Sequence, residues 1–172
     1  AIAYHTPAIG HPDSYALQVL SVALAEGKAS RFYQRLVERE GSTTFTSAEY
    51  GESRDPTLFY IRAEGCGDGP HEAIEVSVHD ELSRIATDGI TEDELERAKH
   101  QIEAHFVFSM ERTLDQAMLL GQIETLAEMN YIDQYLSHVV SVDTAAVAAV
   151  CRKYLCEDNR TVAWLLPEEA GH

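Results

Sequence analysis

Basic residues are scarce in this sequence, and it has no long apolar run. Only 13 Lys and Arg stand against 29 Asp and Glu, which gives a net charge of −16. This balance argues against a nucleic-acid partner, which needs a basic surface, and it suits basic peptides. No apolar stretch approaches the roughly 18 residues of a membrane span. We therefore expect no nucleic-acid partner and no membrane span.

Cysteines and targeting signals are also sparse. Three scattered cysteines, Cys66, Cys151 and Cys156, form no C-x-x-C pair and are too few for a disulfide framework. No basic segment followed by an apolar block opens the chain, as a signal peptide would. The chain starts at Ala1, and residues 1–4 already have the pattern of a strand. We expect a fragment of a longer polypeptide, for which the bacterial periplasm and cytoplasm both stay open.

Length and pattern predict one α+β domain over residues 1–172. The chain is long enough to bury a core. Alternation of apolar residues predicts strands over 2–5, 42–50, 58–63 and 160–166, the last stopped by Pro167. Apolar residues at helical spacing predict helices over 12–27, 31–40, 71–87, 91–129 (with 112–113 as the place for a break), 131–139 and 142–155. Strands and helices do not alternate regularly. A two-layer, mainly antiparallel sheet with helices on one face therefore fits better than a doubly wound sheet.

Three residues mark expected helix starts. Thr91 and Glu94 have the spacing of a capping box, in which each side chain bonds the backbone N–H of the other. Ser30 is the expected N-cap of the helix over 31–40, and Ser141 that of the helix over 142–155.

Three segments carry a family resemblance. They are residues 27–37 (GKASRFYQRLV), residues 88–99 (DGITEDELERAK), and the pieces VSVD, KYL and NRTV within 140–162. In this order they resemble the second domain of the pitrilysin and mitochondrial processing peptidase family. The resemblance implies similar α+β lobes arranged as two clam-shell halves. In such peptidases the first lobe binds zinc through an H-x-x-E-H motif, and the second lobe has no site.

This chain contains no H-x-x-E-H. The resemblance therefore implies a non-catalytic lobe of a zinc metalloendopeptidase, with no catalytic, cofactor-binding or metal-binding residue of its own. Zinc is expected in a zinc-bearing domain of the same polypeptide. The lobe would shape a peptide-binding chamber and dock the zinc-bearing lobe and a partner subunit. A structural or assembly subunit of the same fold, without peptidase activity, is the alternative.

A second family feature is missing as well. The opposite half of such peptidases holds substrate with an Arg and a Tyr in an L-R-E-x-x-G-x-x-Y pattern. In the corresponding residues 36–44 (LVEREGSTT), Val37 stands at the Arg position and Thr44 at the Tyr position, while Arg39 and Phe45 are off register. The resemblance thus favours the lobe beside a zinc-bearing domain, with the Arg and Tyr supplied by a partner subunit.

Pairs of histidines are candidate metal ligands in this sequence. His100 and His105 resemble a zinc motif with one residue inserted. Five helical residues rotate by about 500°, so the two rings diverge by about 140° and cannot reach one ion. A free-standing enzyme using either histidine is therefore a remote alternative.

The remaining candidates are weaker. His71 and His79 are eight residues apart, too far for one ion, and His5 and His11 offer at most a weak metal or partner contact. The acidic helix faces are expected to be solvated. An exposed apolar patch is expected where another lobe docks. Its expected aromatic contributors are Tyr15, Tyr33, Tyr131 and Tyr135.

Overall fold

A single antiparallel sheet organises the chain. The computed structural model describes residues 1–66, 71–128 and 130–166. Within them β1 (Ile2–Thr6), β2 (Thr43–Tyr50), β3 (Thr57–Gly65) and β4 (Arg160–Val162) form one sheet in the order β2-β3-β1-β4. All three neighbouring pairs are antiparallel. The predicted antiparallel sheet and the hairpin of β2 with β3 are confirmed.

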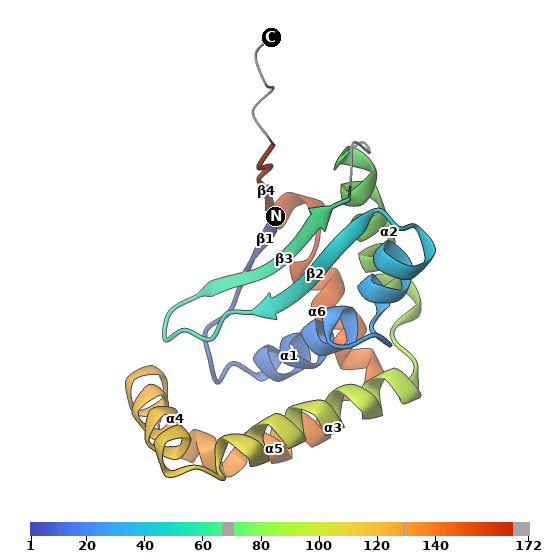
Figure 1. Ribbon diagram of the computed structural model, residues 1–172. Helices are drawn as coiled ribbons and strands as arrows, with labels where there is room; N and C mark the ends of the chain where they lie inside the picture. Colours follow the sequence, from blue (N-terminus) through green and yellow to red (C-terminus); the bar gives the residue numbers. More distant parts are fainter. Residues whose placement is uncertain (67–70, 129, 167–172) are drawn as a thin grey trace.

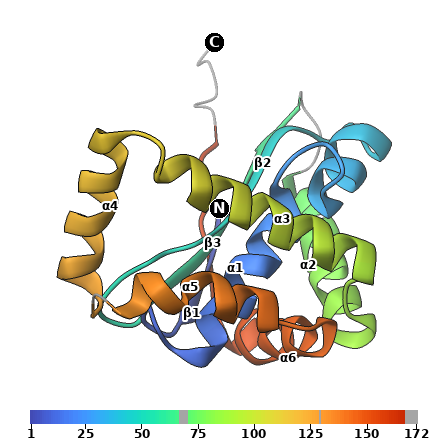
Figure 2. The same ribbon diagram turned by 90° about the horizontal axis from the view of Figure 1, so that it is seen from below.

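The helices gather on one face of this sheet (Figure 1). They are α1 (Pro12–Ala25), the π-helix η1 (Tyr33–Arg39), α2 (His71–Asp88), α3 (Glu92–Ser109), α4 (Thr113–Leu126), α5 (Asn130–Ser141), α6 (Thr144–Tyr154) and the 3-10 helix η2 (Glu157–Asn159). The view from below shows α3 and α5 outermost, with α1 between them and the sheet (Figure 2). This arrangement confirms the predicted α+β architecture. None of the described helices is long and apolar enough to cross a membrane.

The sheet buries one face, as the alternation of its side chains requires. In β1, Ile2, Tyr4 and Thr6 are buried whereas His5 is exposed. Tyr4 lies opposite Phe59 of β3, and both side chains are completely buried. Helix α1 covers this face and contacts β2, α3, α5 and α6. Its consecutive residues 14–20 are all buried, so α1 is the central helix of the core.

Two expected N-caps are wrong. The Ser30 hydroxyl donates to the Gly27 carbonyl at 2.7 Å and bonds no helical N–H. The Ser141 hydroxyl donates to the His138 carbonyl at 2.7 Å because Ser141 is still the last residue of α5. Asp143 caps α6 instead, and its carboxylate accepts from the Ala146 N–H at 2.7 Å. Serine hydroxyls readily bond a carbonyl of the preceding turn, which competes with capping.

The segment over 31–40 is helical, but its main part is wound as a π-helix and not as the expected α-helix. The Glu40 N–H donates to the Arg35 carbonyl, five residues back, at 2.9 Å. Phe32 and Leu36 are completely buried on this segment. Arg35 reaches Glu81 of α2, with 3.4 Å between Nη1 and Oε2. Apolar burial and an ion pair to α2 thus accompany the π-helical winding, which the periodicity of the sequence did not indicate.

Other boundaries differ by small amounts. The expected break in the long helix is confirmed, because α3 ends at Ser109 and α4 begins at Thr113. Strand β4 has three residues and not the expected seven, since only residues 160–162 pair with β1. The expected stop at Pro167 and the end of the long helix at Met129 lie outside the described residues.

One arginine joins the first two segments that carry the family resemblance. The Arg31 guanidinium donates to both carboxylate oxygens of Glu94 at 2.7 and 2.8 Å. It also donates to Glu81 at 3.2 Å and to the Gly89 carbonyl at 3.3 Å. Glu81 is only 7% exposed. Glu94 completes the predicted capping box with Thr91, which is confirmed. A bidentate arginine of this kind gives both strength and a fixed orientation.

We expect Arg31→Ala to lower the free energy of unfolding by about 3 kcal/mol, because it leaves two partly buried carboxylates without their shared cation. Urea denaturation at pH 7 measures this change. Arg54→Ala, at an exposed position, is the control and should stay within about 0.5 kcal/mol of the unaltered chain. A loss below about 1 kcal/mol for Arg31→Ala would show that the ion pair does not organise the fold.

The Arg31–Glu94 ion pair should make the free energy of unfolding fall at acidic pH. Burial alone would raise the pKa of Glu94, but hydrogen bonds from Arg31 and Thr91 outweigh it and lower that pKa from 4.5 to about 2. Because the folded pKa lies below the unfolded one, the stabilisation is complete above about pH 4.5 and is lost as the pH falls towards 2.

We therefore expect Glu94→Gln, which retains a capping side chain, to be less stable than the unaltered chain by roughly 2 kcal/mol at pH 7. This difference should shrink steadily between pH 4.5 and 2. Denaturation curves at several pH values measure it. Glu96→Gln on the same helix, where Glu96 is exposed, should show little difference at any pH. A stability difference between Glu94→Gln and the unaltered chain that does not change with pH would contradict the lowered pKa of Glu94.

Candidate functional site

The zinc-like histidines do not form a site. His100 and His105 both lie on the unbroken helix α3, so the divergence expected from their spacing holds. His100 is exposed. The His105 Nε2 lies 3.2 Å from the Glu26 carboxylate, at the end of α1. These residues do not fit a zinc ion, and no chemical step can be assigned to one here.

The other histidines weighed as ligands, His5, His11, His71 and His79, lie in separate surroundings. His11 caps α1, because its Nδ1 accepts from the Asp13 N–H at 3.0 Å, whereas His5 is exposed on β1. The His71 ring packs edge-on against Trp164 at 4.4 Å. His79 contacts Arg160, and burial together with that charge lowers the pKa of His79. No group of three or more His, Cys, Asp or Glu in the described part of the chain could hold a metal ion.

The cysteines are free, and they differ in exposure. Cys151 is buried in the core, and burial raises the pKa of its thiol to about 12. A thiol held in this protonated state is a poor nucleophile. Cys156 is half-buried and Cys66 is exposed.

Three of the tyrosines expected on a docking patch lie inside the molecule. Tyr15 and Tyr131 are 7% and 8% exposed, and their rings stack at 6.1 Å. Tyr135 is half-buried and packs against Tyr131 at 5.6 Å. The prediction of an exposed patch is wrong for these three, because Tyr131 and Tyr135 of α5 pack against Tyr15 of α1. Tyr33, on η1, is half-buried.

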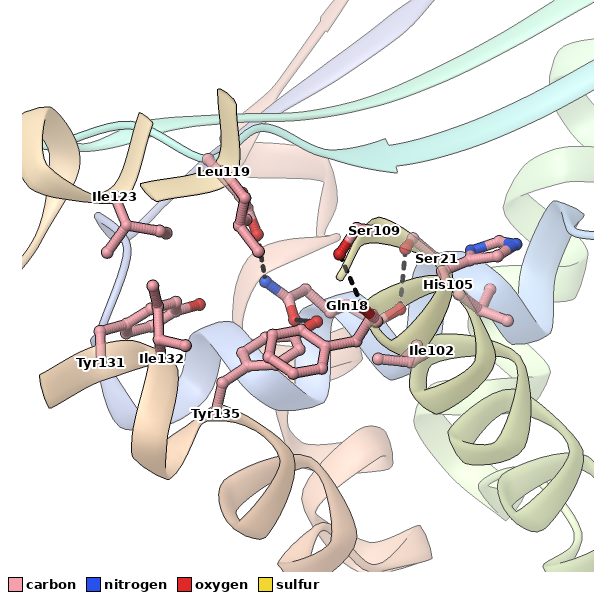
Figure 3. A pocket seen from close by; sticks show the side chains of 13 residues that line it. Gln18, Ser21, Ile102, His105, Ser109, Leu119, Ile123, Tyr131, Ile132 and Tyr135 are labelled. Atoms are coloured by element: carbon pink, nitrogen blue, oxygen red, sulfur yellow. Dashed lines mark hydrogen bonds between the residues drawn. The ribbon is translucent and has the colours of Figure 1, made fainter. Parts of the chain in front are cut away.

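This aromatic cluster borders a pocket of about 310 Å³ (Figure 3). Helices α1, α3, α4 and α5 form its walls, and the segment after β2 contributes one carboxylate. The lining residues are Gln18, Ser21, Val22, Glu52, Ile102, His105, Phe106, Ser109, Leu119, Ile123, Tyr131, Ile132 and Tyr135. A pocket with mostly apolar walls and a few convergent polar groups is the usual form of a ligand site.

A hydrogen-bonded chain crosses the pocket. The Tyr135 hydroxyl donates to Gln18 Oε1 at 2.9 Å, and Gln18 Nε2 donates to Glu52 Oε1 at 2.8 Å. Glu52 is exposed as a residue, but its carboxylate lies among the pocket side chains. This loss of water raises the pKa of Glu52. The buried Tyr131 hydroxyl has no hydrogen-bond partner among the described residues.

A second feature is the exposed apolar surface at the end of α3 and along α4, the α3–α4 surface. Its side chains are exposed by 40–71% and comprise Val107, Phe108, Leu114, Met118 and Leu120. Only Ile123 of α4 is buried. Figure 2 shows α4 at one side of the molecule, where it links α3 to α5. The apolar residues of α4 are visible in the sequence, but their exposure depends on how α4 packs, which the sequence pattern does not contain.

Sequence comparison identifies the family. The Peptidase M16 inactive domain matches residues 1–102, and the chain belongs to this family. The zinc protease PqqE of Helicobacter pylori is 25% identical over 167 residues, which are 97% of this chain and 38% of that protein. An uncharacterized zinc protease of Streptomyces coelicolor is 30% identical over 153 residues, 87% of this chain and 33% of that protein. The chain therefore spans about a third of the length of these relatives.

Solved structures share the fold. The inactive peptidase domain of a putative zinc protease from Bordetella parapertussis superposes with a TM-score of 0.86 at 19% identity, covering 98% of this chain and 92% of that one. A protease from Helicobacter pylori gives a TM-score of 0.88 at 23% identity, covering 92% of this chain and 38% of that one. The chain thus has the fold of the inactive M16 domain, the non-catalytic lobe expected from its motifs.

The positions that lack the Arg and Tyr pattern lie at the sheet edge. Val37 is half-buried on η1, and Thr44 is exposed on β2, where the pairing with β3 is irregular. The off-register Arg39 and Phe45 are both exposed.

We expect the purified chain to retain no stoichiometric zinc after dialysis against buffer with a trace of zinc, because its histidines cannot converge. Elemental analysis measures the metal content. His100→Ala and His105→Ala should leave the content unchanged. One zinc per chain that disappears in either variant would overturn this geometric argument and restore a free-standing enzyme.

Proposed function

We propose that this chain is the non-catalytic lobe of a zinc metalloendopeptidase, in which it shapes the peptide chamber and docks the zinc-bearing lobe. Membership of the inactive M16 domain family supports the absence of catalytic residues from its 172 residues. Relatives named zinc proteases are longer, and this chain matches 38% and 33% of their length. The remaining length is sufficient for a second lobe with the zinc motif.

The α3–α4 surface is the observation that carries the proposal. Leu114 and Met118 are four residues apart, so they share one face of α4, and they are 71% and 69% exposed. A helix that is apolar around its circumference is normally buried. Exposed apolar patches of this kind mark interaction sites. The zinc-bearing lobe of the same polypeptide is the proposed occupant, since relatives named zinc proteases have the additional length for it and a lobe in the same chain is present at a fixed stoichiometry.

Charge and sequence pattern support a role in the chamber. A net charge of −16 draws basic peptides towards the lobe. Val37 and Thr44 stand where the substrate-holding Arg and Tyr of the family would be, so a partner subunit is proposed to supply those two residues. Residues 1–172 would act as one structural unit in this assembly.

We expect Met118→Glu in the complete polypeptide to weaken docking of the two lobes and to lower peptidase activity by tenfold or more, since it buries a carboxylate in an apolar contact. Expressing the lobes as separate chains and measuring their association tests docking directly. Val76→Glu on α2, where Val76 is 58% exposed, is the matched control and should change neither quantity.

Normal association of the Met118→Glu lobe would show that the α3–α4 surface is not the docking site. Tight association without any peptidase activity in the unaltered pair would favour the assembly-subunit alternative.

A further inference from the structure

The Glu52 carboxylate in the pocket has no basic partner. No Lys, Arg or His of the described residues lies within 4 Å of it, and its hydrogen bond comes from the neutral Gln18 amide. The net charge of the chain is already strongly negative. A carboxylate that lines a mostly apolar pocket and bonds a neutral amide, with no cation beside it, is a strong acceptor for a positively charged ligand.

A second polar group is available beside it. Tyr131 is 8% exposed, lines the pocket, and its hydroxyl has no partner among the described residues. Figure 3 shows its hydroxyl turned towards the space beside Gln18. Buried hydroxyls nearly always have a hydrogen-bond partner, so the Tyr131 hydroxyl is available to a polar group that enters the pocket. Gln18 Oε1 accepts from the Tyr135 hydroxyl at 2.9 Å, and as a carbonyl oxygen it has a second lone pair.

The remaining walls suit an aliphatic arm next to a cation. Ile102, Leu119 and Ile123 offer apolar contact, and the Phe106 and Tyr135 rings pack at 5.4 Å from each other. Aromatic faces attract cations. The volume of about 310 Å³ is at the lower end for ligand pockets, and it suits one amino-acid side chain or a small amine.

We propose that this pocket binds a primary ammonium group carried on a short aliphatic arm. The ammonium donates to the Glu52 carboxylate, the Tyr131 hydroxyl and the second lone pair of Gln18 Oε1, which matches its three donors. The arm lies against Ile102, Leu119 and Ile123. Free alkylamines and the lysine side chain of a peptide share this chemistry. The proposal does not depend on lobe docking, because every group belongs to this chain.

The test is an NMR titration of the 172-residue chain. A solved inactive domain of similar extent, of which this chain covers 92%, shows that such a domain folds alone. The probes are n-pentylammonium and its neutral isostere n-pentanol. We expect n-pentylammonium to shift resonances of the pocket residues and to bind at least tenfold more tightly than n-pentanol, as its charge-assisted bonds require.

Variants separate the pocket from general charge effects. Glu52→Gln keeps an acceptor for Gln18 and should weaken n-pentylammonium binding by about tenfold, while n-pentanol binding stays the same. Tyr131→Phe removes one hydroxyl and should weaken it by a few-fold. Glu49→Gln and Tyr33→Phe are the matched controls, since neither residue lines the pocket, and both should bind as the unaltered chain does.

Three outcomes would overturn the proposal. They are equal binding of the two probes, no shift of pocket resonances, and an equal loss of affinity in Glu52→Gln and Glu49→Gln. N-acetyl-lysine N-methylamide then distinguishes the sources. If N-acetyl-lysine N-methylamide binds as tightly as n-pentylammonium, the ligand is a peptide lysine. If n-pentylammonium binds and N-acetyl-lysine N-methylamide does not, the ligand is a free amine.

Discussion

The contact of Arg31 with Glu94 and Glu81 is the interaction on which the rest of the structure depends. It ties the segment leading into η1 to α2 and to the first turn of α3. The direction of α3 follows from this attachment. Because Ile102 and Phe106 of α3 form a pocket wall and α4 follows α3 directly, both candidate surfaces depend on one half-buried arginine. The first two motif segments that resemble the peptidase family are therefore joined by a structural contact.

Local signals predicted much of the fold. The spacing of Thr91 and Glu94 predicted the start of α3, and the alternation of apolar residues predicted β3. Both patterns involve only residues that are close together in the sequence. The π-winding of η1 and the failure of Ser30 and Ser141 to cap a helix were not predictable in this way. The contacts of Arg35 with Glu81 and the continuation of α5 through Ser141 involve tertiary packing, which a local pattern does not contain.

The candidate site was less predictable than the fold. The divergence of the His100 and His105 rings was predicted correctly, since the rotation per residue of an α-helix alone determines it. The pocket unites residues from Gln18 to Tyr135, which no spacing rule brings together. Tyrosine has an apolar ring and a polar tip, so Tyr15 and Tyr131 were assigned to a surface. Packing of α5 on α1 buries them and leaves the Tyr131 hydroxyl without a partner.

The most direct test of the central claim is the sequence of the coding region that adjoins this chain. A non-catalytic lobe needs a zinc-bearing lobe of about one further domain, on the order of 100–200 residues. The account predicts an H-x-x-E-H motif there, followed by a more distant Glu that completes the zinc site. An adjoining domain of the same fold in which these residues are replaced would contradict the peptidase assignment and leave a structural subunit.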